Sequence, residues 1–260
     1  MLSYNLFFQL IKSLIVNYKF LFYRMRSFNY YINSYISSSK EQTVNTIKNL
    51  VKDDFKNVDC FIIKSSQGNG GTHLLQGTFE LLKEHKKKIA FYNAERVLTE
   101  LNKNKKELES YFLEHQYVAI DDFQLFYFKN FPNTQFWIEN LYDKLLINKK
   151  KLLLTLTENS INEINIPNFL FKGKIKTIES DYPLDKKSEI IENTFKESQS
   201  TINPEIFKYL ISQNFPSVRF LKNICISIIA KTKNDNKNIG TMNLNEFKNL
   251  YQKYIDIIYK

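Results

Sequence analysis

Apolar residues are spaced in two different ways along the chain, and the change comes near residue 182. Before that point, short apolar runs alternate with stretches in which apolar residues recur at helical spacing. The runs predict strands at residues 60–65, 88–93, 117–122, 151–157 and 174–179, with helices at residues 42–51, 71–85 and 134–147. Near-continuous apolar strands that alternate with helices indicate a parallel sheet covered on both faces.

After residue 182 the pattern is helical throughout. Residues 182–198, 203–215, 216–233 and 243–258 each follow the helical period. Asp185, Asn203 and Asn243 stand where N-capping residues are preferred, and Pro204 suits a first helical turn. We therefore expect an α/β domain over residues 27–181, with a parallel five-stranded sheet flanked by helices, and a small all-helical domain over residues 182–260.

Residues 1–26 form an apolar and basic extension with no acidic residue before Glu41. Lys12, Asn17 and Lys19 interrupt its apolar run, so no stretch reaches the roughly 20 apolar residues of a membrane-spanning helix. No small-residue cleavage site follows, so a secretory signal is not expected. Three interpretations stay open: an interfacial anchor, a partner-binding peptide, or a leader upstream of a start at Met25.

Charge and cysteine content add little to this organisation. The formal charge of +10 favours acidic partners such as nucleic acid, but a lysine-rich and asparagine-rich composition produces the same charge without such a role. The charged runs at residues 85–88 and 103–106 are therefore expected to be solvated. The two cysteines, Cys60 and Cys225, lie in apolar runs with no CxxC spacing, which predicts reduced core residues and a cytoplasmic protein.

Candidate chemistry begins in the stretch FIIKSSQGNGGTHLLQG, residues 61–77. A strand, a glycine-containing loop and a helix in this order direct backbone N–H groups towards an anion. Against the pattern G-x-x-x-x-G-K-[ST], Gly70 and Thr72 match, whereas Ser65 replaces the first glycine and Gly71 replaces the lysine. The stretch is therefore either a phosphate-binding loop without its lysine or a tight turn.

A second candidate element follows about fifty residues later. The apolar run YVAIDD ends in Asp121 and Asp122, where phosphate-loop proteins place one acid for magnesium and one for the attacking water. Thr157 and Glu158 end the next strand, as a residue contacting the outer phosphate would. The order of these elements favours the nucleotide-site interpretation. His73, His85 and His115 have no metal-ligand spacing, and Trp137, Phe136 and Leu141 are expected in the core.

The segments GNGGTHLLQG, AIDDFQLF, LYDKLLINKKKLLLTLTEN, YPLDKKSEII and PSVRFLKNI resemble, in this order, the AAA+ module of the DnaA family. The resemblance runs from about Ser27 to the C-terminus. An initiator of this family would continue into a helix-turn-helix domain that binds origin DNA. This chain ends with its last predicted helix, so it is similar to the regulatory members of the family.

The resemblance implies the site residues position by position. Asp121 and Asp122 would be the acidic pair, with Thr72 and Asp121 as magnesium ligands. Glu158 would take the first sensor position and Arg219 the second. ADP or ATP would bind with magnesium at Gly68, Asn69, Gly70, Gly71, Thr72 and His73, the last in a packing rather than a catalytic role.

The resemblance also implies partners. Lys172 stands where the family has an arginine finger that reaches into a neighbouring subunit's ATP, although lysine lacks the planar fork of arginine. Gln9 and Leu10, with Leu14, stand where such regulators carry a peptide that binds the sliding clamp of DNA polymerase. The expected partners are therefore DnaA and the clamp, with weak or indirect DNA contact and a homo-oligomer allowed.

Two functions follow from this likeness. The first is a regulator that promotes hydrolysis of DnaA-bound ATP and prevents over-initiation, while Gly71 makes ATP hydrolysis by the chain itself negligible. The second is a nucleotide-free adaptor that keeps the AAA+ shape as an interaction surface, which Ser65, Gly71 and Lys172 favour.

Overall fold

The structure of the chain is a computed structural model, and its described part excludes the N-terminal extension. Gln9, Leu10 and Leu14 of the expected clamp-binding peptide, and the expected capping residue Asp185, lie outside the described residues. The described residues are 32, 35, 40–127, 132–158, 164–180, 186–235 and 238–258.

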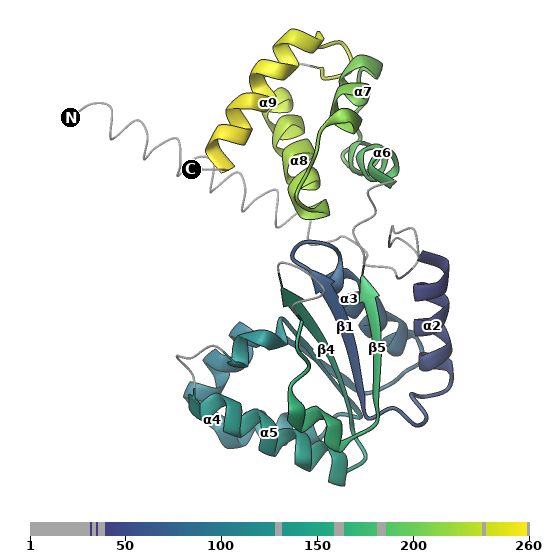
Figure 1. Ribbon diagram of the computed structural model, residues 1–260, viewed down its shortest axis with the longest axis vertical. Coiled ribbons are helices and arrows are strands. Elements are labelled where there is room, and N and C mark those ends of the chain that lie inside the picture. Colours follow the sequence, from purple (N-terminus) through teal and green to yellow (C-terminus); the bar gives the residue numbers. More distant parts are fainter. Residues whose placement is uncertain are drawn as a thin grey trace, which may run out of the picture. The chain divides into compact units, whose positions relative to one another are not determined.

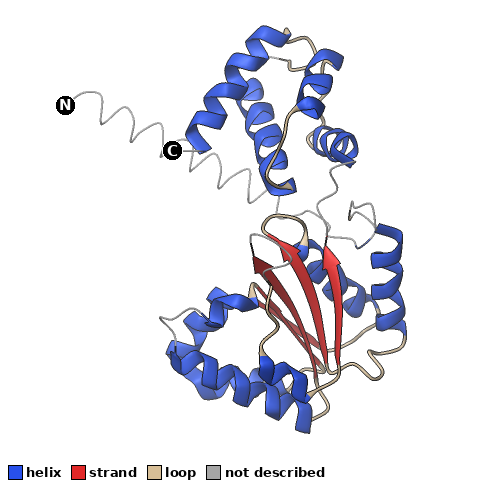
Figure 2. Ribbon diagram, viewed as in Figure 1, coloured by secondary structure: helices blue, strands red, loops and turns tan. Residues whose placement is uncertain are grey.

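A five-stranded sheet with every neighbouring pair parallel forms the centre of the first domain (Figure 2). Its strand order is β2-β3-β4-β1-β5, so β1 lies between β4 and β5. The strands are β1 Cys60–Ser66, β2 Ile89–Asn93, β3 Tyr117–Asp121, β4 Lys151–Glu158 and β5 Ile175–Ser180. Each lies within one residue of its predicted bounds, because polar residues end every apolar run. The expected fold class is confirmed.

Helices cover both faces of the sheet (Figure 1). Alternate side chains of each strand point to opposite faces, so Phe61 and Ile63 pack against α2 Lys40–Lys52 and α3 Gly71–Glu84. Cys60 and Ile62 pack on the other face, against α4 and α5. The remaining elements of this domain are α4 Ala94–Leu113, η2 Phe123–Tyr127, α5 Pro132–Ile147 and η4 Asn168–Lys172.

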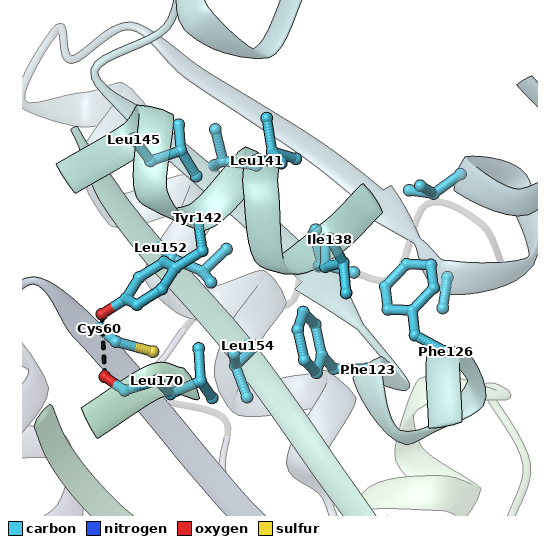
Figure 3. Packing of buried hydrophobic residues seen from close by; sticks show 14 of the residues in the cluster. Cys60, Phe123, Phe126, Ile138, Leu141, Tyr142, Leu145, Leu152, Leu154 and Leu170 are labelled. Atoms are coloured by element: carbon cyan, nitrogen blue, oxygen red, sulfur yellow. Dashed lines mark hydrogen bonds between the residues drawn. The ribbon is translucent and has the colours of Figure 1, made fainter. Parts of the chain in front are cut away.

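The core beneath α5 is built from one stripe of that helix (Figure 3). Leu141, Tyr142 and Leu145 lie on the strands, and the Tyr142 hydroxyl donates a hydrogen bond to the Leu170 carbonyl at 3.2 Å. Trp137 and Leu141 are buried as expected, but Phe136 is 69% exposed, so its expected core position is wrong. One residue corresponds to about 100° around a helix, which turns Phe136 away from the stripe of its neighbours.

The second domain consists of helices in its described residues and has a core of its own. The side chains of Asn203 and Asn243 cap α7 and α9, accepting from the amides of Glu205 at 2.8 Å and Glu246 at 2.9 Å. Both caps were predicted. The helices are α6 Lys187–Glu197, α7 Pro204–Ser212, α8 Val218–Asn234 and α9 Leu244–Ile258.

Cys60 and Cys225 are both buried free thiols, as predicted. Burial raises the pKa of the Cys60 thiol above its ordinary range and that of the Cys225 thiol to about 12. None of the helices in the described ranges combines the length and the apolar character that crossing a membrane requires.

Candidate functional site

The loop between β1 and α3 has the backbone shape of a phosphate-binding turn. Gly68 and Gly70 have left-handed φ values of 78° and 100°, which favour glycine. Gly70 is the N-cap of α3, which begins at Gly71. Within the described residues, the amides of Gly71 and Thr72 have no backbone partner. The start of α3 therefore keeps the unpaired N–H groups that attract an anion.

The acidic pair lies at the carboxyl end of β3. Asp121 is 6% exposed, and its carboxylate accepts hydrogen bonds from the hydroxyls of Thr155, at 2.6 Å, and Thr72. Burial raises the pKa of Asp121, and the neighbouring charge of Asp122 acts in the same direction. Asp122 follows the strand with a left-handed φ of 55°. The structure thus brings Thr72 and Asp121 together.

Hydrogen bonds continue from this pair across the end of the sheet. The Thr155 hydroxyl also accepts from the Asp122 amide at 2.8 Å. The Gln124 side chain donates to Asp122 at 3.3 Å and accepts from the Thr157 amide at 3.1 Å. The network therefore joins β3 and β4 through protein groups alone. Gln124 stands in the segment AIDDFQLF that carries the family resemblance, but these contacts were not predicted. Thr155 was not expected at the site, although a hydroxyl within an apolar strand was the available signal.

Ser65 fills the space beside the position of the missing lysine. A Cβ atom at position 71 would lie closer than 3.0 Å to Ser65 Oγ and 3.1 Å from Ser65 Cβ, so one of them would have to shift. Ser65 is 2% exposed, and its hydroxyl lies 3.3 Å from that of Thr157. Gly71 is therefore the residue that fits beside Ser65. The two departures from the motif are sterically linked.

The loop also contacts the first turn of α8. The Asn69 side chain accepts a hydrogen bond from the Val218 amide at 3.2 Å, and the Gly68 carbonyl accepts one from the Arg219 amide at 3.0 Å. Asn69 itself is 5% exposed. Arg219, the expected second sensor, meets the loop through its backbone, and its side chain is exposed.

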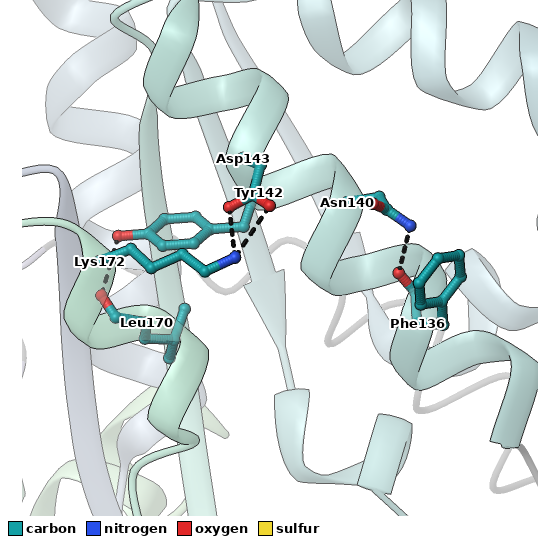
Figure 4. Close-up of polar contacts among 6 residues, drawn as sticks. All are labelled: Phe136, Asn140, Tyr142, Asp143, Leu170 and Lys172. Carbon is teal, nitrogen blue, oxygen red and sulfur yellow. Dashed lines mark hydrogen bonds and ion pairs between the residues drawn. The ribbon is translucent and has the colours of Figure 1, made fainter.

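The other expected residues have different positions. Glu158 ends β4 with an exposed side chain, and its carbonyl accepts from the Gln67 amide at 2.8 Å. Lys172, at the end of η4, is exposed and forms an ion pair with Asp143 of α5 at 2.8 Å and 2.9 Å (Figure 4). His73 lies edge-on to the Tyr35 ring, with centroids 6.0 Å apart, in agreement with a packing role.

Known proteins resemble this chain in fold but not in sequence. No known family model and no curated protein matches the sequence. The fold, however, aligns with solved structures of replication initiation proteins. Domain III of the Thermotoga maritima replication initiation protein DnaA matches with a TM-score of 0.71 at 16% identity, over 88% of this chain and 98% of that one. The chain has an AAA+ fold.

Two longer proteins share this AAA+ fold. A DNA replication initiation factor matches with a TM-score of 0.64 and 19% identity over 78% of this chain, and AMPPCP-bound DnaA from Aquifex aeolicus with 0.63 and 18% over 79%. The alignments cover 65% and 66% of those two chains, so this chain spans slightly less than two thirds of their length.

The nucleotide that an AAA+ fold implies fits these residues only in part. The amides at the start of α3 suit a phosphate group. The lysine that would neutralise the outer phosphates is replaced by Gly71, and the Thr72 hydroxyl already donates to Asp121. No cluster of three or more His, Cys, Asp or Glu side chains suited to a metal ion occurs in the described residues. Because the residue that would neutralise the outer phosphates is absent, we assign no hydrolytic step to this fold.

Proposed function

We propose that the chain acts in DNA replication initiation as a regulator that binds DnaA and promotes hydrolysis of DnaA-bound ATP, as the DnaA-related protein Hda does. The AAA+ fold shared with DnaA supports this proposal. The observation that carries it is the position of Ser65, whose side chain obstructs a Cβ atom at the lysine position. A module of this kind acts on the nucleotide of a partner rather than on its own.

The exposed end of η4 supplies the chemistry that such a role requires. Lys172 follows Phe171, whose side chain is 62% exposed. The Lys172 ammonium faces the Asp143 carboxylate of α5 (Figure 4). Exposed ion pairs contribute about 0–1 kcal/mol, so a phosphate group can compete with Asp143 for the ammonium. We assign Lys172 the role of a positive charge presented to ATP on DnaA, with apolar neighbours that suit a protein surface.

The clamp completes the proposal. Gln9, Leu10 and Leu14 would bind the DNA polymerase sliding clamp as a short apolar peptide in a hydrophobic groove. This contact would bring the regulator to DnaA after the clamp is loaded on DNA. Contact of the chain itself with DNA would be weak or indirect.

The second candidate is a nucleotide-free adaptor that binds DnaA without stimulating it. The Lys172–Asp143 ion pair favours it, because the bidentate contact occupies the charge that a trans-acting residue needs. Thermal unfolding with and without millimolar ADP and magnesium separates the two: an adaptor shows no shift in melting temperature, whereas a nucleotide-binding regulator is stabilised.

The deciding experiment measures ATP hydrolysis by purified DnaA, with and without this chain and DNA-loaded clamp. We expect the chain to raise the rate of ATP hydrolysis by DnaA. We expect Lys172→Ala to reduce this stimulation at least about tenfold, since trans-acting arginines contribute a factor of about 10³–10⁵ in rate. Lys144→Ala is the matched control, because Lys144 is a similarly exposed, ion-paired lysine of α5. Binding without stimulation would establish the adaptor, and absence of binding would exclude both functions.

A further inference from the structure

The first turn of α8 is completed by the loop rather than by its own domain. A helix begins with N–H groups that lack partners within the helix. In α8, Ser217 supplies the local cap by accepting from the Phe220 amide at 3.2 Å. The two amides before it, those of Val218 and Arg219, bond to Asn69 and Gly68 of the other domain.

Asn69 is held rigidly on the side of the loop. Its side-chain amide donates to Ser66 Oγ, and its backbone carbonyl accepts from the Ser180 hydroxyl at the end of β5. The Ser180 oxygen in turn lies 2.9 Å from the Tyr35 hydroxyl. An acceptor whose side chain and backbone are each held by a hydrogen bond can cap a helix with little loss of side-chain entropy.

Close packing accompanies these hydrogen bonds. A Cβ atom added to Gly68 would lie 2.8 Å from Ser217 Oγ and 3.0 Å from Arg219 Cβ, so the loop backbone touches α8 directly. The contact consists of protein atoms from both domains.

We propose that the loop is a latch that fixes the helical domain on the α/β domain without nucleotide. The latch is defined by Gly68 and Asn69 on one side and by Ser217, Val218 and Arg219 on the other. The orientation of α8 is then set by the sequence of the chain and does not change with nucleotide supply. This inference concerns the chain alone and is independent of whether it stimulates DnaA.

The test measures the distance between the two domains in the full chain by electron spin resonance. Spin labels are placed on Ser110→Cys of α4 and Lys253→Cys of α9, both at exposed positions. Cys60 and Cys225 are buried and do not compete for the label. We expect one narrow distance distribution without nucleotide, unchanged by millimolar ADP and magnesium.

Two variants open the latch in different ways. Asn69→Ala removes the acceptor, and Val218→Pro removes the donor at the first position of a helix, where proline is tolerated. We expect each variant to broaden the distance distribution. In Asn69→Ala, we also expect the Arg219 amide, which donates to the Gly68 carbonyl of the same loop, to exchange with solvent roughly fivefold faster. Asn203→Ala is the matched control, because it removes an asparagine cap that contacts the helical domain only.

The latch is overturned by either of two results. One is a broad distribution for the unmodified chain that narrows with ADP. The other is an unchanged narrow distribution in Val218→Pro, which decides the matter even where Asn69→Ala fails to fold. A broad distance distribution in Asn203→Ala would also overturn the latch, because movement between the domains would then follow from the loss of a helix cap that does not join them.

Discussion

Replacing Gly71 by alanine tests the steric link with Ser65. The added Cβ would lie closer than 3.0 Å to Ser65 Oγ, and both residues are buried. Overpacking of this kind costs about 1–3 kcal/mol. Turning Ser65 aside instead breaks its contact with Thr157, which contributes about 0.5–1.5 kcal/mol. Against this, alanine in place of a helical glycine gains at most about 1 kcal/mol. We expect Gly71→Ala to destabilise the chain by about 1–2 kcal/mol.

The effect of Gly71→Ala on the free energy of unfolding should have the opposite sign once Ser65 is replaced by glycine. In Ser65→Gly, the obstruction is gone and the added Cβ would lie 3.7 Å from Thr155 Cγ2, an ordinary contact, so Gly71→Ala keeps the helical gain of up to about 1 kcal/mol. Urea unfolding of the four proteins gives the double-mutant cycle, with an expected coupling of about 1.5–3 kcal/mol. Equal effects of Gly71→Ala in the two backgrounds, within about 0.5 kcal/mol, would refute the steric argument.

Lysine at position 71 extends the test to ligand binding. Gly71→Lys alone meets the same obstruction as alanine and should unfold more readily. The double variant Ser65→Gly, Gly71→Lys removes the obstruction and restores the ammonium beside the amides of α3. We expect millimolar ADP and magnesium to raise its melting temperature by more than they raise that of the unmodified chain. A double variant that folds but is not stabilised would show that the loop lacks more than its lysine.

Further predictions follow from burial. Phe136→Ser should change the free energy of unfolding by no more than about 0.5 kcal/mol, whereas Trp137→Ala, one residue away, should cost about 3–5 kcal/mol. Because the pKa of Asp121 is raised, the contribution of this carboxyl to stability falls as pH rises from 3.8 through its folded pKa. Asp121→Asn should therefore gain stability relative to the unmodified chain over that pH range, and parallel pH–stability curves would contradict this. Cys60 and Cys225 should resist a thiol reagent in the native state and react in denaturant; rapid native reaction would contradict their burial.

Much of the fold is encoded in local patterns. Each strand was predicted within one residue because its apolar run ends in polar residues, and the caps Asn203 and Asn243 follow from chemistry within three residues. The interior break of α4 at Asn104, with φ −151° and ψ 87°, was not predicted. Phe136 was misplaced because spacing to a single buried neighbour does not define which face of a helix is buried.

The sequence names residues for the candidate site but does not specify their contacts. A motif assigns Ser65 and Gly71 separately, whereas their link depends on the rotamer of one side chain and the path of the loop. The contact between Asn69 and Val218 joins residues 149 positions apart. Such contacts depend on how the two domains pack, which local hydrophobic patterns do not specify.

Sheet topology separates the loop from the charge that would act on a partner. The strands are parallel, and β1 and β5 are paired with Cys60 opposite Ile175. The loop follows the carboxyl end of β1, whereas Lys172 precedes the amino end of β5. A strand of seven residues spans about 20 Å, so Lys172 lies roughly that far from the loop and cannot reach a phosphate bound there. A phosphate that Lys172 contacts is therefore not one bound at the loop of the same chain. The obstruction of position 71 by Ser65 and the position of Lys172 are thus two separate observations that support the proposal of a chain acting on the nucleotide of a partner.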